Sequence, residues 1–149
     1  MNNIWIELNN EIPKYAKEIS KKYNLKIMGI NDLKTALIGF DFIILLSIDK
    51  FSASVSYIHR DEKGELWLYS CDNFLAEKYD NKDRVGLLKE DGVKEIIINE
   101  LIIIINGLQN KWEDVLKGNR DWLVDFKKSK WYNISKLENK EKEIINKYI

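Results

Sequence analysis

His59 and Cys71 are the only histidine and cysteine in this sequence, and they are its candidates for a catalytic base and nucleophile. A catalytic dyad requires hydrogen-bonding distance between the two groups. The expected strand pairing places Cys71 toward the far end of a strand from His59, about six residues away at ~3.3 Å each, or about 20 Å. We therefore predict no Cys–His dyad, and we interpret His59 as a structural histidine beside a turn.

Metal and phosphate sites also lack their usual patterns. A zinc site needs at least three Cys or His ligands at short spacing, and this chain has two such residues in total. The seven glycines are scattered and form no phosphate-binding loop. The acids Asp72, Glu77, Asp80 and Asp83 lack the order of a calcium loop, so solvated caps and turns explain them better. We expect no catalytic residues, no cofactor and no metal.

The composition limits the class of protein. With 149 residues, 45% of them hydrophobic and 32% charged, the chain is expected to form one globular domain over 1–149. Its formal net charge of zero argues against a dedicated nucleic-acid binder, whose affinity comes from a basic surface. Isoleucine, lysine and asparagine number 22, 21 and 15, and these residues have A/T-rich codons, which is typical of an AT-rich bacterial or phage genome.

The expected compartment follows from three further features. A single cysteine offers no disulfide framework and gives no sign of an oxidising environment. The N-terminal residues lack the basic and long apolar regions of a signal peptide. The longest nearly apolar run, 96–105, is far shorter than the ~20 residues that cross a bilayer. We expect a soluble, cytoplasmic protein with no membrane partner.

Apolar periodicity in the first forty residues predicts mixed structure. Alternation over 4–8 indicates a short extended segment, and Asn10 can cap a helix that ends near Asn24. Residues 25–30 are predicted as a strand. Residues 31–40 fit either a helical turn or a strand, and we favour the strand.

The next section predicts a three-stranded antiparallel meander. Strands 42–48 and 51–60 flank a two-residue turn, Asp49-Lys50, which pairs Ile48 with Phe51. A second turn, 61–64, pairs Arg60 with Glu65. Both registers agree on one core face, which carries Phe42, Ile44, Leu46, Ile48, Phe51, Ala53, Val55, Tyr57, Leu66 and Leu68. The opposite face then carries Ile43, Leu45, Ser47, Ser52, Ser54, Ser56, Ile58, Trp67 and Tyr69.

The stretch 91–108 is predicted as one buried helix, around which the rest of the chain is organised. Asp91 is the expected N-cap and Gly107 the expected stop. Glu95, Asn99 and Asn106 form a thin polar stripe on an otherwise apolar surface. The alternative is a pair of buried strands, because β-branched residues dominate this stretch.

Shorter helices are expected on both sides of this stretch. Asp72 can cap a helix over 73–79, a charged connection covers 80–90, and Gly118 ends a helix over 110–117. Asn119 can cap the following helix, and the spacing Ser135-x-x-Glu138 predicts a capping box for the last one. The predicted fold class is α+β, an antiparallel β-meander in the N-terminal half packed against a helical C-terminal half.

With no catalytic set, the surface is the place to look for function. Small hydroxyls beside large aromatics suit a protein-binding face, because Trp and Tyr supply contact area at low entropic cost. Our predicted partner-binding residues are Ser54, Ser56, Trp67, Tyr69, Asp72, Asp80 and Asp83. The alternative is that the C-terminal helices cover this face as a second core.

Several segments resemble the small single-domain immunity proteins encoded beside bacterial toxins of polymorphic and contact-dependent systems. They are Val55-Ser56-Tyr57-Ile58, Asp72-Asn73-Phe74-Leu75, Leu108-x-x-x-Trp112-x-x-x-Leu116-x-Gly118 and Asp121-Trp122. Such proteins neutralise a cognate toxin by binding it, often over its active site, without chemistry of their own. The resemblance implies one protein partner and carries over no functional residue.

The leading hypothesis is therefore a protein-binding inhibitor of the immunity or antitoxin kind. A phage-encoded inhibitor of a host defence protein is the alternative of the same class. A small-ligand sensor, or an enzyme with a deep pocket lined by His59 or the acids of 72–83, is the alternative of a different class. A homodimer formed through an exposed meander edge also stays open.

Overall fold

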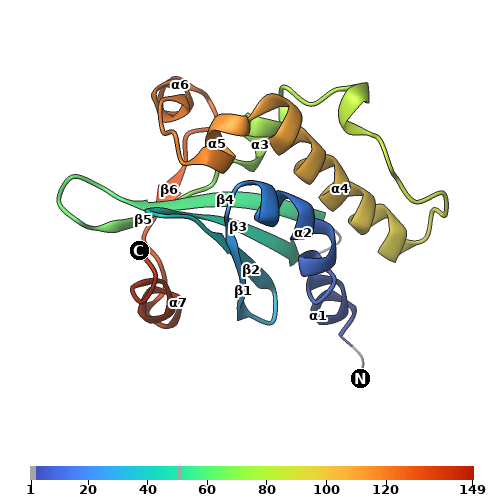
Figure 1. Ribbon diagram of the computed structural model, residues 1–149, viewed down its shortest axis with the longest axis horizontal. Coiled ribbons are helices and arrows are strands. Elements are labelled where there is room, and N and C mark those ends of the chain that lie inside the picture. The colour runs from blue at the N-terminus through green and yellow to red at the C-terminus, as the bar shows by residue number, and fades with distance from the viewer. Residues whose placement is uncertain (1–2, 50–51) are drawn as a thin grey trace.

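The computed structural model describes residues 3–49 and 52–149, and it confirms an α+β fold (Figure 1). Within these residues one antiparallel sheet holds six strands in sequence order. They are β1 (Lys26–Asn31), β2 (Lys34–Ile38), β3 (Phe42–Asp49), β4 (Ser52–Arg60), β5 (Leu66–Tyr69) and β6 (Ile134–Ser135). The expected meander is thus the centre of a larger sheet, and residues 34–38 form a strand, as we favoured.

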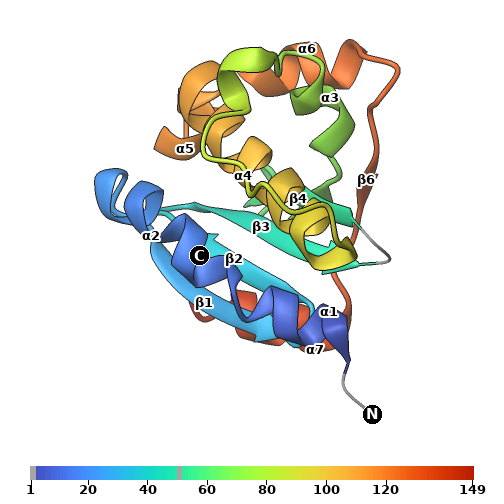
Figure 2. The same cartoon turned by 90° about the vertical axis from the view of Figure 1, so that its right-hand side faces the viewer.

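Helices cover both faces of this sheet. They are α1 (Ile4–Asn9), α2 (Ile12–Lys22), α3 (Asp72–Ala76), α4 (Val93–Lys111), α5 (Glu113–Lys117), α6 (Trp122–Lys128) and α7 (Asn139–Ile145), with a 3₁₀ turn, η1 (Asn81–Asp83). In Figures 1 and 2, α4 lies across one face while α7 lies against the other. Among the described residues, no helix combines the length and apolarity needed to cross a bilayer.

The sheet therefore separates two apolar cores. The larger core joins α1, α2 and α4 to the sheet face that carries Ile44, Leu46 and Tyr57. The smaller core lies on the opposite face, where Leu137 and Ile145 pack on Ile43, Leu45, Ile58 and Leu66. Part of the face predicted to meet solvent is thus a second core, the alternative left open from the sequence.

The first predicted hairpin has the right faces and a shifted register. Ile48 pairs with Ala53 and Asp49 with Ser52, two residues from the predicted alignment. Since side chains alternate with period two, this shift leaves every residue on its predicted face. Lys50 of the predicted turn, and Phe51 of the predicted core face, lie outside the described residues.

The second hairpin has the wrong register by one residue. Arg60 pairs with Leu66 rather than Glu65, and His59 pairs with Trp67. The amide of Gly64 donates to Asp61 and that of Asp61 to Glu65, and Gly64 has a φ of 83°. A one-residue shift reverses both faces of β5. Trp67 and Tyr69 therefore face the larger core, and Leu66 and Leu68 the smaller one.

Helix α4 confirms the buried helix and corrects both of its ends. It begins after Gly92 rather than Asp91, and it continues past Gly107 to Lys111. Asn99 of the predicted polar stripe exchanges hydrogen bonds with the backbone of Leu88. Asn106 donates to the carbonyls of Asp83 and Val85. The stripe thus holds the 80–90 connection against the helix.

Several local predictions at the chain ends and caps are wrong. Asn10 does not cap the second helix, because α2 begins after Glu11. Residues 4–8 are helical, because the Asn3 side chain caps Trp5 and a helical turn brings Leu8 into the core. Ser135 pairs with β5 in a strand instead of opening a helix. Asp72 lies inside the first turn of α3, after Cys71. Helix α6 begins after Asp121, and the Asn119 side chain accepts from the Asp121 amide.

Candidate functional site

The edge of β4 is open over half of its length. Strand β5 pairs with β4 from Tyr57 to Arg60, so among the described residues 52–56 have no strand on that side. The amide of Ala53 donates to Glu100 Oε2 at 2.8 Å, and the amide of Val55 donates to Asp72 Oδ1 at 3.1 Å. Two carboxylates therefore occupy the donors that another strand would use, which discourages edge-to-edge pairing.

Two adjoining hollows lie along this edge, and they share Ser54, Asp72 and Asn73. The first has a volume of about 430 Å³, and its walls also include Ser56, Ser70, Lys130, Trp131, Tyr132 and Asn133. The second has a volume of about 360 Å³, and its walls also include Ser52, Ala53, Ala76, Tyr79, Glu100, Ile103 and Ile104. We call these hollows together the edge groove. Hydroxyls, aromatic rings and acids meet in it.

The electrostatics of the edge groove are acidic. Burial raises the pKa of Asp72, the Val55 amide opposes that rise, and the charge of Glu100 adds to it. Neither Asp72 nor Glu100 forms an ion pair with any residue of the described chain. The wall contains one lysine, Lys130, which forms no ion pair with either acid. Two neighbouring carboxylates without an ion-pair partner attract a positively charged group.

Three of the seven predicted contact residues line the edge groove, namely Ser54, Ser56 and Asp72. The Ser54 hydroxyl also shares a 2.8 Å hydrogen bond with Ser47 on β3. The groove is also lined by three residues that were not predicted, namely Glu100, Trp131 and Tyr132. Tyr132 is 42% exposed. Glu100 carried a usable signal, because it is the only charged residue in the apolar run 96–105. Trp131 and Tyr132 carried no such signal, since their position depends on the return of the chain to the sheet at β6.

Trp67 and Tyr69 do not join this groove. The Trp67 indole donates to Asp61 Oδ2 at 2.9 Å, and the ammonium of Lys136 lies 5.7 Å from the ring centre. Tyr69 is 4% exposed and its ring stacks on His59. Their predicted place beside the serines is wrong because of the one-residue register shift described above.

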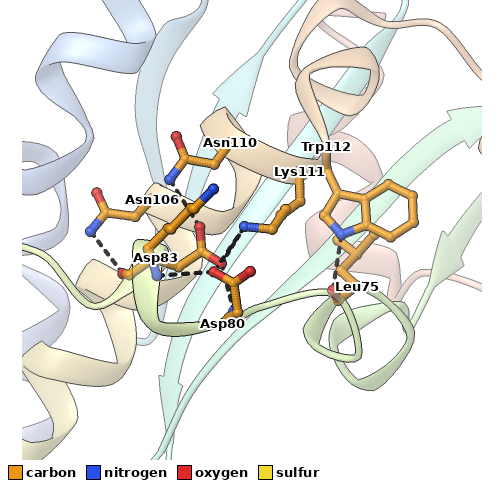
Figure 3. A network of polar contacts seen from close by, with 8 residues as sticks. Leu75, Asp80, Asp83, Asn106, Asn110, Lys111 and Trp112 are labelled. Atoms are coloured by element: carbon orange, nitrogen blue, oxygen red, sulfur yellow. Dashed lines mark hydrogen bonds and ion pairs between the residues drawn. The ribbon is translucent and has the colours of Figure 1, made fainter.

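Asp80 and Asp83 belong to a separate polar network around η1, which Figure 3 shows. Asp83 is fully buried, and its carboxylate accepts hydrogen bonds from Asn110, Lys111 and the Asp80 amide. Asp80 is exposed, accepts from the Lys82 amide and pairs with Lys111 at 3.1 Å. The full burial of Asp83 indicates a structural role for this residue.

The two candidate reactive groups are both buried. Burial raises the pKa of the Cys71 thiol, whose sulfur lies 3.9 Å from the Val55 carbonyl. A nucleophilic cysteine needs the opposite shift. Burial lowers the pKa of His59, whose Nδ1 lies 2.7 Å from the Arg60 carbonyl oxygen. Among the described residues, no group of three or more His, Cys, Asp or Glu side chains is placed to hold a metal ion.

Comparisons with known proteins return no match to a family model, to a curated protein or to a solved structure.

Proposed function

We propose that this chain is a non-enzymatic, protein-binding inhibitor that neutralises one cognate bacterial toxin in the cytoplasm, in the manner of immunity proteins. The observation that carries the proposal is the acidic pair of the edge groove. Asp72 and Glu100 have no ion-pair partner among the described residues, and they lie in adjoining hollows walled by Trp131, Tyr132 and Ile103. A basic side chain of the partner, inserted between the aromatic rim and α4, would neutralise both.

The composition of the edge groove supports a protein as the ligand. Aromatic side chains are enriched where proteins bind each other, and a charge that becomes desolvated on binding contributes most when its partner is charged. Tyr132 is exposed, and the Trp131 indole is held by a hydrogen bond to Glu77. A rim that is fixed before binding loses less entropy in the complex.

The acidic groove also supports a nuclease as the target. Enzymes that act on nucleic acids carry basic clefts, and carboxylates on an inhibitor attract such clefts over a distance. A phage-encoded inhibitor of a host defence nuclease would use the same surface. The genes beside this one separate the two sources.

The environment of the reactive side chains supports a role without catalysis. The thiol of Cys71 is buried and its pKa is raised, which disfavours the nucleophilic thiolate. The His59 ring lies on the core side of β4, away from the edge groove that we assign to the partner.

The test begins with capture of the partner from the organism that encodes the chain, together with co-expression of the neighbouring open reading frame. We then expect Asp72→Asn combined with Glu100→Gln to weaken binding at least tenfold. Each substitution keeps the oxygen that accepts from the β4 amide and removes the charge, so the fold is retained. Loss of a desolvated charge pair costs about 2 kcal/mol or more, and about 1.4 kcal/mol is tenfold in affinity.

Glu143→Gln in α7 is the matched control, because it removes one exposed charge on the opposite face of the sheet. The Glu143→Gln variant should bind the captured toxin with the same affinity as the unmodified chain. A captured toxin that binds the double variant with unchanged affinity would refute the assignment of the edge groove. Growth inhibition by the neighbouring gene product that persists on co-expression would refute the inhibitor function.

A further inference from the structure

A third cavity, of about 580 Å³, shares no residue with the edge groove. It lies between the β4–β5 hairpin and α6, which face each other in Figure 1. Its walls are His59, Arg60, Asp61, Glu62, Lys63, Tyr69, Arg120 and Lys127. We call it the hairpin pocket. Its walls are rich in charge, so it suits a polar ligand.

His59 places a fixed, titratable ring at the wall of this pocket. Its ring stacks on Tyr69 with centroids 4.8 Å apart and contacts Tyr57 at 5.6 Å, and only 9% of the residue is exposed. Nδ1 lies 2.7 Å from the Arg60 carbonyl, which can only accept, so Nδ1 carries the proton of the neutral ring. Nε2 is buried and has no hydrogen-bond partner among the described residues. Nε2 is enclosed in the free protein, so a group bound in the pocket acts on the His59 ring through its charge rather than through a direct hydrogen bond.

Three cationic side chains reach the pocket from three segments. Lys63 of the hairpin and Lys127 of α6 form no ion pair with the described part of the chain. Arg120, between α5 and α6, places one nitrogen 3.0 Å from Asp41. A guanidinium has five N–H donors, so Arg120 keeps others for a ligand.

The remaining charges of the wall are satisfied or peripheral. Arg60 donates to the carbonyls of Gly64 and Ile149 and to the Asn146 side chain. The Asp61 carboxylate already accepts from three N–H groups, those of the Lys63 and Glu65 amides and of the Trp67 indole. Glu62 is exposed. The groups left to contact a ligand are thus two lysines and part of an arginine, beside the His59 ring.

We propose that the hairpin pocket binds a small molecule through a phosphate-type oxyanion, which Lys63, Lys127 and Arg120 contact and whose charge favours protonation of the adjacent His59 ring. A phosphate group has several oxygens and up to two charges, and separate cations can therefore contact it from different sides. This site is independent of the proposed inhibitor function, since the edge groove is elsewhere on the molecule.

Binding in this form is coupled to proton uptake. In the free protein burial lowers the pKa of His59, and the cations Arg120 and Lys127 lower it further, while the Arg60 carbonyl and Asp41 oppose them. The Arg60 guanidinium, Asp61, Glu62 and Lys63 are the other charged groups of the wall. A bound anion favours the protonated imidazolium, so the pKa of His59 must rise in the complex.

The probe is inorganic pyrophosphate, titrated by calorimetry into the whole chain. We expect Lys63→Ala and Lys127→Ala each to weaken its binding at least fivefold. Lys140→Ala, which removes an exposed lysine on α7, should change it less than twofold. Nuclear magnetic resonance of the His59 ring should show a higher pKa when pyrophosphate is present.

Four outcomes would overturn the proposal. They are absence of pyrophosphate binding, equal weakening by Lys140→Ala, a His59 pKa that pyrophosphate leaves unchanged, and tighter binding of citrate than of pyrophosphate. The last outcome would assign the pocket to polycarboxylates. None of them bears on the test of the edge groove, because Lys63 and Lys127 are not part of its walls.

Discussion

Replacing Asp83 by alanine is expected to destabilise the protein by about 3 kcal/mol. Its carboxylate is fully buried and accepts from Asn110 at 2.9 Å, from Lys111 at 3.1 Å and from the Asp80 amide at 2.9 Å. Alanine would leave the Asn110 side-chain amide and the Asp80 backbone amide without this acceptor, and Lys111 would keep only Asp80. The cost of such a loss is mainly that of the groups left unpaired. Urea unfolding followed by circular dichroism measures the difference.

The matched control is Asp80→Asn, at the other acid of the same network (Figure 3). Asp80 is exposed, with 54% of its side chain accessible, and the amide oxygen of asparagine can still accept from the Lys82 amide. The free energy of unfolding of the Asp80→Asn variant should stay close to that of the unmodified chain. If Asp83→Ala and Asp80→Asn lowered the free energy of unfolding equally, the burial of Asp83 would not be the reason for its contribution to stability.

The pH dependence of Asp83 has a definite sign. Burial alone would raise the pKa of Asp83, but its hydrogen bonds from Asn110, the Asp80 amide and Lys111 outweigh burial and hold the pKa below its ordinary value. The ionised form is therefore the one that the fold stabilises, and its contribution is present above the unfolded pKa of about 4 and lost as the pH falls through the folded value. The stability gap between the unmodified chain and Asp83→Asn should narrow below about pH 4.

The strand faces show how far the sequence determines this fold. An error of two residues at the β3–β4 turn left all faces correct, whereas an error of one residue at the β4–β5 turn reversed β5. The alternation of apolar residues indicated the two faces of each strand in both hairpins. The number of loop residues depended on Gly64 adopting a positive φ, and the four turn-forming residues 61–64 do not specify that by themselves. Trp67 and Tyr69 were lost from the predicted site for this reason alone.

The candidate site was predictable where it depends on neighbours in sequence. Ser54 and Ser56 follow from strand alternation, and Asp72 lies at the start of the next element. Glu100 and Trp131 reach the same groove from α4 and from the segment before β6, both far from β4 along the chain. Glu100 is recognisable as a charged residue in an apolar run, but nothing local in the sequence places either Glu100 or Trp131 beside β4.

Gly107 shows why one expected helix end was wrong. A glycine near the end of an apolar run is typical of a helix stop, but here it lies inside α4. A Cβ at this position would overlap the ring of Tyr79, which packs directly on the helix backbone. The Trp112 indole, at the end of α4, donates to the Leu75 carbonyl at 2.9 Å. This hydrogen bond fixes α3, the helix that precedes Tyr79, against α4. Position 107 therefore requires glycine because the Tyr79 ring lies so close to the helix backbone.

This close contact predicts a change of sign between two backgrounds. In the unmodified chain, Gly107→Ala is expected to destabilise by about 1–3 kcal/mol, because the added methyl group overpacks the site against Tyr79. In a Tyr79→Ala background the ring is absent, and the same substitution should stabilise by up to about 1 kcal/mol, the gain in helix propensity from glycine to alanine. Urea unfolding of the two single variants and the double variant gives the coupling directly.

Gly29 is the control position for overpacking, because a Cβ there would meet nothing within 4 Å. Gly29→Ala should give the same free-energy change with and without the Tyr79 ring, since the two sites share no contact that the ring could transmit. If Gly107→Ala also had the same sign in both backgrounds, the contact with Tyr79 would not be the reason for glycine at position 107. A reversal confined to Gly107 would instead show that packing against the 72–79 segment, rather than helix termination, requires a residue without a side chain there.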